Sequence, residues 1–209
     1  MKKKLMTVLA LVLVIAMSVA GTYAYLTSTD TVKNTFTVGN VQIKLDEAAA
    51  NADGSLVPNA DRVKANSYKL LPGHTYAKDP MVTVLAGSES SYVKMTVTFS
   101  NAAELDAIFD PNGATLTNIF NGYDSTNWIY KGNTKDTENN TRTYEFWYKE
   151  TVAAPTADVA LDALFDSITV PENLTNAQLA TINDMTITVN AYAIQADGFD
   201  DADDAWDHF

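Results

Sequence analysis

The sequence predicts a mainly β protein, a jelly roll or β-sandwich with short helices inserted in the connections between strands. Apolar and polar residues alternate in several short segments, as they do in strands with one buried face. Turn-forming pairs such as Asn121-Gly122 lie among these segments, which is typical of all-β domains. We expect strands at residues 35–38, 41–45, 81–85, 93–99, 128–130, 144–148 and 185–193.

Helical spacing of apolar residues occurs in three places, each after a residue suited to cap a helix. Asn101 and Glu104 have the spacing of a capping box, and Asp158 and Asp200 precede the other two segments. The three apolar stripes are formed by Leu105, Ile108 and Phe109; by Leu161, Leu164, Phe165 and Ile168; and by Ala202, Trp206 and Phe209. Residues 46–67 are polar and rich in Ala and Asn, so we expect a long loop there.

The composition excludes several classes of function. The chain has 209 residues, with 26 acidic and 14 basic side chains and a net charge of -12, so nucleic acid is not an expected partner. It contains no cysteine, which excludes disulfides, Fe–S clusters and thiolate zinc sites. The two histidines, His74 and His208, belong to no HExxH motif, and no GxSxG motif is present. We therefore expect no catalytic residues and no metal site of these kinds.

The first 24 residues have the pattern of a secretory signal peptide. Lys2, Lys3 and Lys4 precede an apolar run at residues 5–20, and small residues follow. We expect cleavage after Ala24, with Thr22 at position −3, so that Tyr25 becomes the first residue of the mature chain. The alternative is an uncleaved anchor, although the apolar run is shorter than the ~20 residues of a spanning helix. Residues 25–209 are then expected to form a single β-sandwich domain.

The C-terminal segment DGFDDADDAWDHF is strongly acidic. Its helical spacing favours an acidic helix face in contact with water. A weak calcium site is the alternative, because Ca²⁺ prefers oxygen ligands, although the spacing of an EF-hand is absent. The residues of that alternative site are Asp197, Asp200, Asp201, Asp203 and Asp204. No other cofactor is expected.

Three stretches together resemble one protein family. They are GTYAYLTSTDTVKNTFTVGNVQIKL, YKLLPGHTYAKDPMVTVLAGSESSYVKMTV and ITVNAYAIQADGFDDADDAW. In this order they are similar to the TasA/camelysin family of Gram-positive bacteria, and particularly to its biofilm-matrix members of the BsaA type. The first stretch resembles a signal that is removed by a SipW-type signal peptidase.

The resemblance implies a secreted jelly-roll protein of the extracellular matrix or cell surface that assembles head to tail into fibres. Its partners would be other copies of itself and, during export, the SipW-type peptidase. In the family's pattern the new N-terminus is a donor strand that inserts into the next subunit. The residues of that strand here would be Tyr25, Leu26, Val32, Phe36 and Val38. The alternative is that this segment is an ordinary first strand within its own sheet.

Two other functions remain open at this point. Camelysin carries a zinc-endopeptidase label, so a secreted metalloendopeptidase of the camelysin type is one alternative, although this sequence has no zinc motif to receive that role. A monomeric cell-surface adhesin is the other alternative. Its contact patch would use aromatic side chains, although such side chains more often pack in a core. The candidates are Tyr123, Trp128, Tyr130, Trp147 and Tyr148.

The charge of the mature chain leads to a first prediction. Removal of residues 1–24 takes away three lysines and no acid, which leaves 11 basic and 26 acidic residues and a net charge of -15. Subunits with this charge repel one another over a Debye length of roughly 8–10 Å at physiological ionic strength. We expect added NaCl, mild acid or CaCl₂ to promote fibre formation, measured by light scattering. A scattering signal that stays flat across all three series would contradict this expectation.

Overall fold

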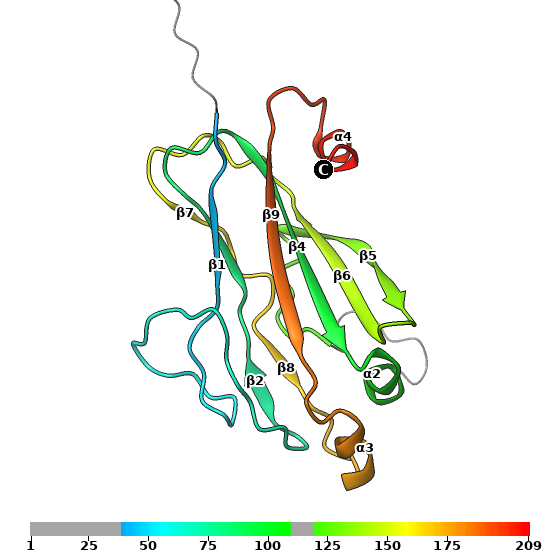
Figure 1. Ribbon diagram of the computed structural model, residues 1–209. Coiled ribbons are helices and arrows are strands. Elements are labelled where there is room, and N and C mark those ends of the chain that lie inside the picture. The colour runs from blue at the N-terminus through cyan, green and yellow to red at the C-terminus, as the bar shows by residue number, and fades with distance from the viewer. Residues whose placement is uncertain (1–38, 110–118) are drawn as a thin grey trace, which may run out of the picture. The chain divides into compact units, whose positions relative to one another are not determined.

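A computed structural model describes residues 39–109 and 119–209, which belong to one compact unit that begins at Gly39 (Figure 1). The expected strand at 35–38 lies outside the described residues. Strands and short helices follow one another along the chain. In order they are β1 (Ile43–Asp46), β2 (Thr75–Ala77), β3 (Met81–Val84), β4 (Ser91–Ser100), α2 (Ala102–Phe109), β5 (Trp128–Asp136), β6 (Thr141–Tyr148), β7 (Val159–Ala160), β8 (Ser167–Thr169), α3 (Asn176–Thr181), β9 (Ile187–Gln195) and α4 (Ala202–Asp207).

The predicted mainly β sandwich is confirmed. One sheet has the order β5-β6-β4-β9 and a second has the order β1-β3-β7, while β2 and β8 form a small separate pair. All of these pairings are antiparallel. β4 buries every second residue, from Ser91 to Phe99, and β3 buries Val82 and Val84. Because both sets belong to one hydrophobic cluster, the inner faces of the two large sheets share a single core.

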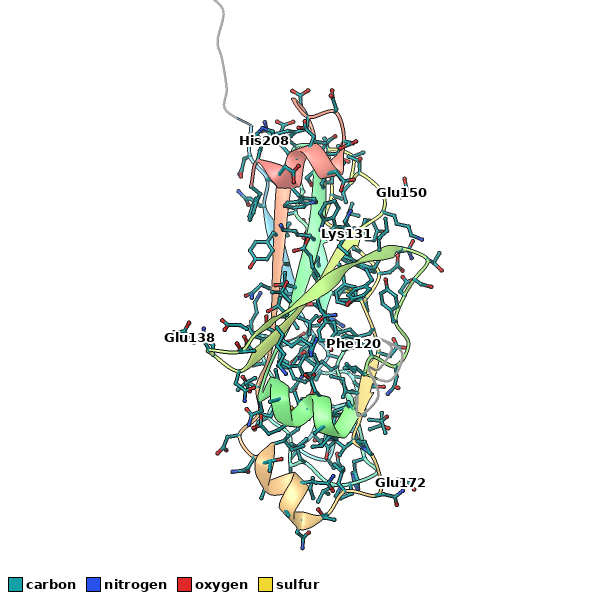
Figure 2. All side chains as sticks on the ribbon, turned by 90° about the vertical axis from the view of Figure 1, so that its right-hand side faces the viewer. Phe120, Lys131, Glu138, Glu150, Glu172 and His208 are labelled. Atoms are coloured by element: carbon teal, nitrogen blue, oxygen red, sulfur yellow. The ribbon has the colours of Figure 1, made fainter. Side chains whose placement is uncertain are left out.

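Aromatic side chains fill the centre of this core. Phe120 lies in the interior of the molecule (Figure 2). Its ring centroid is 4.6 Å from that of Phe165 and 5.4 Å from that of Tyr144. The ring of Phe146 is 5.8 Å away and meets Phe120 edge to face. Trp128 is also buried, and its indole N–H donates a hydrogen bond of 3.0 Å to the main-chain oxygen of Asp162. These contacts join β5 and β6 to the connection that follows β7.

Helix α2 occurs where the spacing predicted a helix, but the expected capping box is wrong. Asn101 has a positive φ of 56°, and its side-chain amide donates to the main-chain oxygen of Thr181. The cap comes instead from Asn140, whose side-chain oxygen accepts from the main-chain N–H of Ala103. Glu104 accepts from the amide of Asn140, so the predicted acidic residue of the first turn supports a cap supplied by the β5–β6 turn.

The helix expected after Asp158 is wrong. Its residues form β7 and β8 with irregular chain between them. The reason is that the main chain pairs with β3 and its surroundings: the N–H of Leu161 donates to the oxygen of Val82, and the N–H of Leu164 donates to that of Pro80. All four apolar residues of the expected helix are nevertheless buried. The sequence therefore predicted correctly that they face the core, and only the helical period was wrong. The four residues are Leu161, Leu164, Phe165 and Ile168.

The C-terminal helix is confirmed as α4, with Asp201 rather than Asp200 as its N-cap. Trp206 is buried, whereas the side chain of Phe209 is 63% exposed. Helix α3 was not predicted, although Thr175 and Gln178 form a complete capping box at its start. Among the described residues, no helix is long and apolar enough to span a membrane.

The long loop predicted at 46–67 is largely confirmed. Asp46 is the last residue of β1, and the rest has no named strand or helix. The loop is held by two isolated bridges, Glu47 with Val63 and Ala50 with Leu56. The loop therefore returns to the end of β1, which places residues 64–66 beside the gap between β1 and β9.

Candidate functional site

The candidate site is the open side of the sandwich, where the edge of one sheet faces the edge of the other. β1 is the last strand of its sheet on this side, and β9 is the last strand of the four-stranded sheet. In the part of the chain that the structure describes, each of these two strands has one neighbouring strand only. We call the space between these edges the β1–β9 seam; Figure 1 shows the two strands facing each other across it.

At the edge of β9 that faces the seam, the main-chain groups of every second residue point away from β4. The N–H of Ala196 donates to the oxygen of Ser90, and the N–H of Ser100 donates to the oxygen of Thr186. These two bonds fix the even-numbered residues of β9 as those that bond to β4. The main-chain N–H and C=O groups that point into the seam therefore belong to Ile187, Val189, Ala191, Ala193 and Gln195.

The free edge of β1 follows from the same reasoning. The N–H of Leu85 donates to the oxygen of Gln42, so even-numbered residues of β1 bond to β3. The main-chain groups of Ile43 and Leu45 point toward the seam, where the ammonium of Lys64 donates to the oxygen of Leu45. The side chains of Ile43 and Leu45 are half-buried against the core, as are those of β9 at alternate positions from Ile187 to Ala193.

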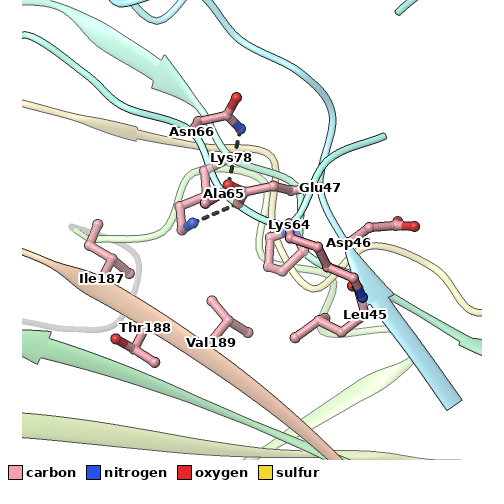
Figure 3. Close-up of a pocket in the computed structure, with 11 residues that line it drawn as sticks. Leu45, Asp46, Glu47, Lys64, Ala65, Asn66, Lys78, Ile187, Thr188 and Val189 are labelled. Atoms are coloured by element: carbon pink, nitrogen blue, oxygen red, sulfur yellow. Dashed lines mark hydrogen bonds and ion pairs between the residues drawn. The ribbon is translucent and has the colours of Figure 1, made fainter. Parts of the chain in front are cut away.

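A cleft of about 370 Å³ lies in the seam, between the end of β1 and the start of β9 (Figure 3). Its walls combine apolar strand residues with charged side chains from the loop. The lining residues are Leu45, Asp46, Glu47, Lys64, Ala65, Asn66, Lys78, Pro80, Ile187, Thr188 and Val189. The cleft is therefore apolar on the β9 side and charged on the opposite side.

The charged side of the cleft is built around one buried ion pair. The ammonium of Lys78 lies 2.6 Å from a carboxylate oxygen of Glu47, and both side chains are less than one-tenth exposed. The second carboxylate oxygen of Glu47 accepts from the amide of Asn66 at 3.0 Å (Figure 3). Removal of one partner of such a pair leaves a buried charge uncompensated, which typically costs about 3–5 kcal/mol.

Arg62 fastens the end of the loop to β1. Its guanidinium lies 2.5 Å from a carboxylate oxygen of Asp46 and 2.8 Å from one of Asp79. Burial raises the pKa of the Asp46 carboxyl, but hydrogen bonds and charges from Lys44 and Arg62 outweigh burial and hold that pKa below its ordinary value of 3.8. The ionised form of Asp46 therefore contributes to holding the loop in place.

A second, larger cleft of about 1050 Å³ continues the seam past the start of β9. It shares Asn66, Lys78 and Ile187 with the first cleft, so the two are adjacent. Its walls come from residues 66–70 on one side and from α3 and the chain before β9 on the other. Its apolar lining side chains are Tyr68, Leu70, Leu179, Ala180, Met185 and Ile187.

Several predicted site residues lie outside the described part of the chain. These are Thr22 and Ala24 of the cleavage site and the donor-strand residues Tyr25, Leu26, Val32, Phe36 and Val38. Their roles remain predictions.

The aspartates of the alternative calcium site have other contacts. Asp201 caps α4 by accepting from the N–H of Asp204, and Asp203 lies 2.9 Å from the ammonium of Lys131. Within residues 39–109 and 119–209, no group of three or more acidic or histidine side chains is arranged to hold a metal ion. Calcium binding by Asp197, Asp200, Asp201, Asp203 and Asp204 remains a prediction. His74 and His208 are both exposed and lie far apart in the sequence.

The aromatic residues proposed for an adhesin patch do not form one exposed surface. Trp128 is 1% exposed, and Tyr123, Tyr130 and Tyr148 are packed against the core. Trp147 lies beneath the ammonium of Lys131, 3.8 Å from its ring centroid. Most of these side chains therefore serve packing.

The charged residues of the seam were not singled out in the sequence. The structure buries Tyr76, Lys78 and Pro80 and leaves the residues between them half-buried, so the three share one face of an extended segment. That alternation places the Lys78 side chain on an inward face, where a lysine needs a partner. Nothing comparable in the sequence identifies Glu47 as that partner, since the two are joined only through the return of the loop.

Comparison with known proteins gives one match. Residues 1–66 match the model of a family described as camelysin metallo-endopeptidase. No curated protein and no solved structure matches the chain significantly. The match supports the resemblance to the TasA/camelysin family, whereas the BsaA type is not supported by it. The matched residues include Asp46, Glu47, Arg62 and Lys64 of the seam and contain no histidine.

The contacts of Asp46 lead to a prediction about acid stability. Because its pKa is lower in the folded than in the unfolded chain, its stabilising contribution is complete above pH 3.8 and is lost as the pH falls through the folded-state pKa. We expect Asp46→Asn to lower the free energy of unfolding at pH 6 and to reduce the further loss of stability below pH 3.8. Urea unfolding at several pH values measures both effects.

The matched control is Asp61→Asn, since Asp61 is exposed in the same loop. We expect its unfolding free energy to follow that of the unaltered protein at every pH. Equal pH dependence in the Asp46 variant and the unaltered protein would contradict the role given to Asp46.

Proposed function

We propose that this chain is a secreted structural protein of a biofilm matrix, because residues 1–66 match the camelysin family model and support the resemblance to the TasA/camelysin family. It is exported through the signal at residues 1–24 and self-assembles into fibres at the cell surface. Assembly proceeds by exchange of the mature N-terminal strand, residues 25–38, which each copy inserts into the β1–β9 seam of the next copy. As part of this proposal we assign the chain to the BsaA type of the family.

The observation that carries this proposal is that, among residues 39–109 and 119–209, β9 pairs with β4 alone and its other edge has no partner. This strand has nine residues, pairs with β4 without a register shift, and contains no proline, glycine or charged residue. An edge of this kind is a template for strand addition, because its free N–H and C=O groups can bond to another chain. A chain that adds a strand from its neighbour and donates its own makes a contact that does not close, so it grows a filament.

The segment at 25–38 has the pattern that such an edge requires. Its even-numbered positions include Leu26, Val32, Phe36 and Val38, and its odd-numbered positions are mostly Thr. A strand with this alternation presents its apolar side chains to the core and its threonines to water. Removal of the signal peptide would free its N-terminal end.

An endopeptidase role receives less support from this chain. The family description names a metallo-endopeptidase, but the matched residues contain no histidine and no cysteine. The described part of the chain likewise brings no three metal-ligating side chains together. The family match covers the signal, the segment proposed to be donated and part of one wall of the seam.

The direct test is a shortened mature chain that begins at Thr35. It lacks most of the donated segment and retains all residues of the sandwich. We expect the mature chain 25–209 to form fibres in negative-stain microscopy and the shortened chain to remain monomeric under the same conditions. Fibres formed equally well by the shortened chain would overturn the proposal.

A second test addresses the accepting edge. The N–H of Ala191 points into the seam, so Ala191→Pro removes a donor that the incoming strand needs and leaves the β4 pairing intact. We expect this change to slow fibre growth by about tenfold or more, because it removes one main-chain hydrogen bond and the proline ring hinders the close approach of the incoming strand. The matched control, Ala191→Val, retains the N–H group and is expected to assemble. Equal growth of the proline variant and the control would contradict the role of the β9 edge.

A further inference from the structure

We infer that the donated strand enters the seam from the Ile187 end, runs antiparallel to β9, and anchors Phe36 in the larger cleft. This inference rests on the proposed strand exchange and assigns its direction, its register and its specificity-determining residue.

The direction follows from where each subunit releases its N-terminal segment. The main-chain oxygen of Asn40 accepts from the N–H of Glu89, and the oxygen of Ser90 accepts from the N–H of Ala196. The described chain therefore begins beside the end of β9 at Gln195. Both clefts lie at the opposite end, around Ile187. A subunit thus releases its strand at one end of β9 and has its clefts at the other.

A filament of identical contacts requires that the releasing end of one subunit face the receiving end of the next. The donated strand then enters beside Ile187 with residue 38 outermost and its N-terminus directed toward Gln195. β9 runs from Ile187 to Gln195. The donated strand therefore runs antiparallel to β9 and parallel to β1. Entry from the Gln195 end would bring the Gln195 ends of the two subunits together, so that the two would join as a closed pair.

The larger cleft fits an aromatic anchor. Its apolar wall includes Leu70, Leu179 and Met185, which are half-buried against the core. Phe36 is the largest apolar side chain between residues 26 and 38 and lies near the outer end of the inserted strand. A buried aromatic side chain in a preformed pocket typically contributes a large share of the binding free energy.

The charges of the seam agree with an uncharged anchor at this position. Lys78 lines both clefts, and its charge is already compensated by Glu47. An incoming strand therefore needs no countercharge beside Ile187. In the proposed arrangement, the even-numbered donor residues beside Ile187 are Phe36 and Val38, and both are apolar. Asp30 is the only acidic residue among the even-numbered donor positions, and it would lie in the half of the strand nearer Gln195.

The register follows from the alternation of both strands. Odd-numbered residues of β9 turn their main-chain groups toward the seam, and even-numbered residues of the donor carry the apolar side chains. Phe36 opposite Ile187 satisfies both conditions. It places Val32 opposite Ala191 and Thr35 opposite Thr188, with residue 38 beside Met185. The 14 residues of the segment span up to about 46 Å when extended, which exceeds the roughly 30 Å of the nine-residue β9.

Engineered cysteines test the direction, because the natural sequence contains none. One mature chain carries Thr35→Cys and the other carries Thr188→Cys, so a disulfide between them can only join two copies. Residues opposite each other at a non-hydrogen-bonded position are about 4.5 Å apart at Cα, within the range that a disulfide spans. The comparison pair, Thr35→Cys with Ile194→Cys, tests entry from the Gln195 end.

We expect the mixture of Thr35→Cys and Thr188→Cys chains to give a cross-linked dimer on mild oxidation, by non-reducing electrophoresis, and the comparison pair to give none. Cross-linking of the comparison pair alone, or of neither pair in a mixture that forms fibres, would overturn the inference while the proposed strand exchange stands. Absence of fibres from the unaltered mature chain under all assembly conditions would overturn both.

A second variant tests the anchor. We expect Phe36→Ala to slow fibre growth by at least about tenfold, and its matched control Thr35→Ala to grow at close to the unaltered rate.

Leu179→Arg places a charge in the accepting cleft, and we expect it to block growth while the monomer still unfolds cooperatively. Leu179→Arg chains retain a working donor strand, and Phe36→Ala chains retain a working cleft. A mixture of the two variants is therefore expected to form dimers. Normal fibre growth by both variants would overturn the assignment of Phe36 and its cleft.

Discussion

The constraint on which this structure depends is the hydrogen bonding of two strand edges, β1 and β9, that face each other on one side of the sandwich. A main-chain N–H or C=O group has to bond either to another chain segment or to water. In the described part of the chain, alternate residues of both strands have no neighbouring strand on that side. At Ile43 and Leu45 and at alternate positions from Ile187 to Ala193, the side chains are apolar and half-buried, so a further strand on β9 would extend both the ladder and the core.

The two edges of the four-stranded sheet differ in a way that directs strand addition to one of them. β5 contains a register shift between Tyr130 and Gly132, and Lys131 and Lys135 carry charges along it. Such features protect an edge from pairing with another chain. β9 has none of them. The wall opposite β9 adds charges that are already paired, because Glu47 compensates Lys78. The seam therefore presents hydrogen-bonding groups and apolar surface beside a compensated ion pair, with Lys64 bonded to the main-chain oxygen of Leu45.

Much of the fold could be predicted from alternation and spacing, because each strand of the sandwich has one buried face. β3, β4, β6 and β9 occur where alternation indicated them, and α2 and α4 where apolar spacing did. The predicted helix after Asp158 failed because its apolar stripe satisfies the core equally well as extended chain bonded to β3. The seam could not be found in the sequence. Whether a strand lies at an edge depends on the order of strands in the sheet, and the Glu47–Lys78 pair forms only through the long loop.

Hydrogen exchange at single amides of β9 tests the central claim most directly. In the monomeric mature chain, the N–H groups of Ile187, Val189 and Ala191 should exchange quickly, while those of Thr188 and Asn190, which bond to β4, should be protected. On fibre formation the first set should become protected and the second should change little. Protection of all five amides in the monomer would contradict an unpaired edge. Continued fast exchange of the first set within fibres would contradict strand addition to β9.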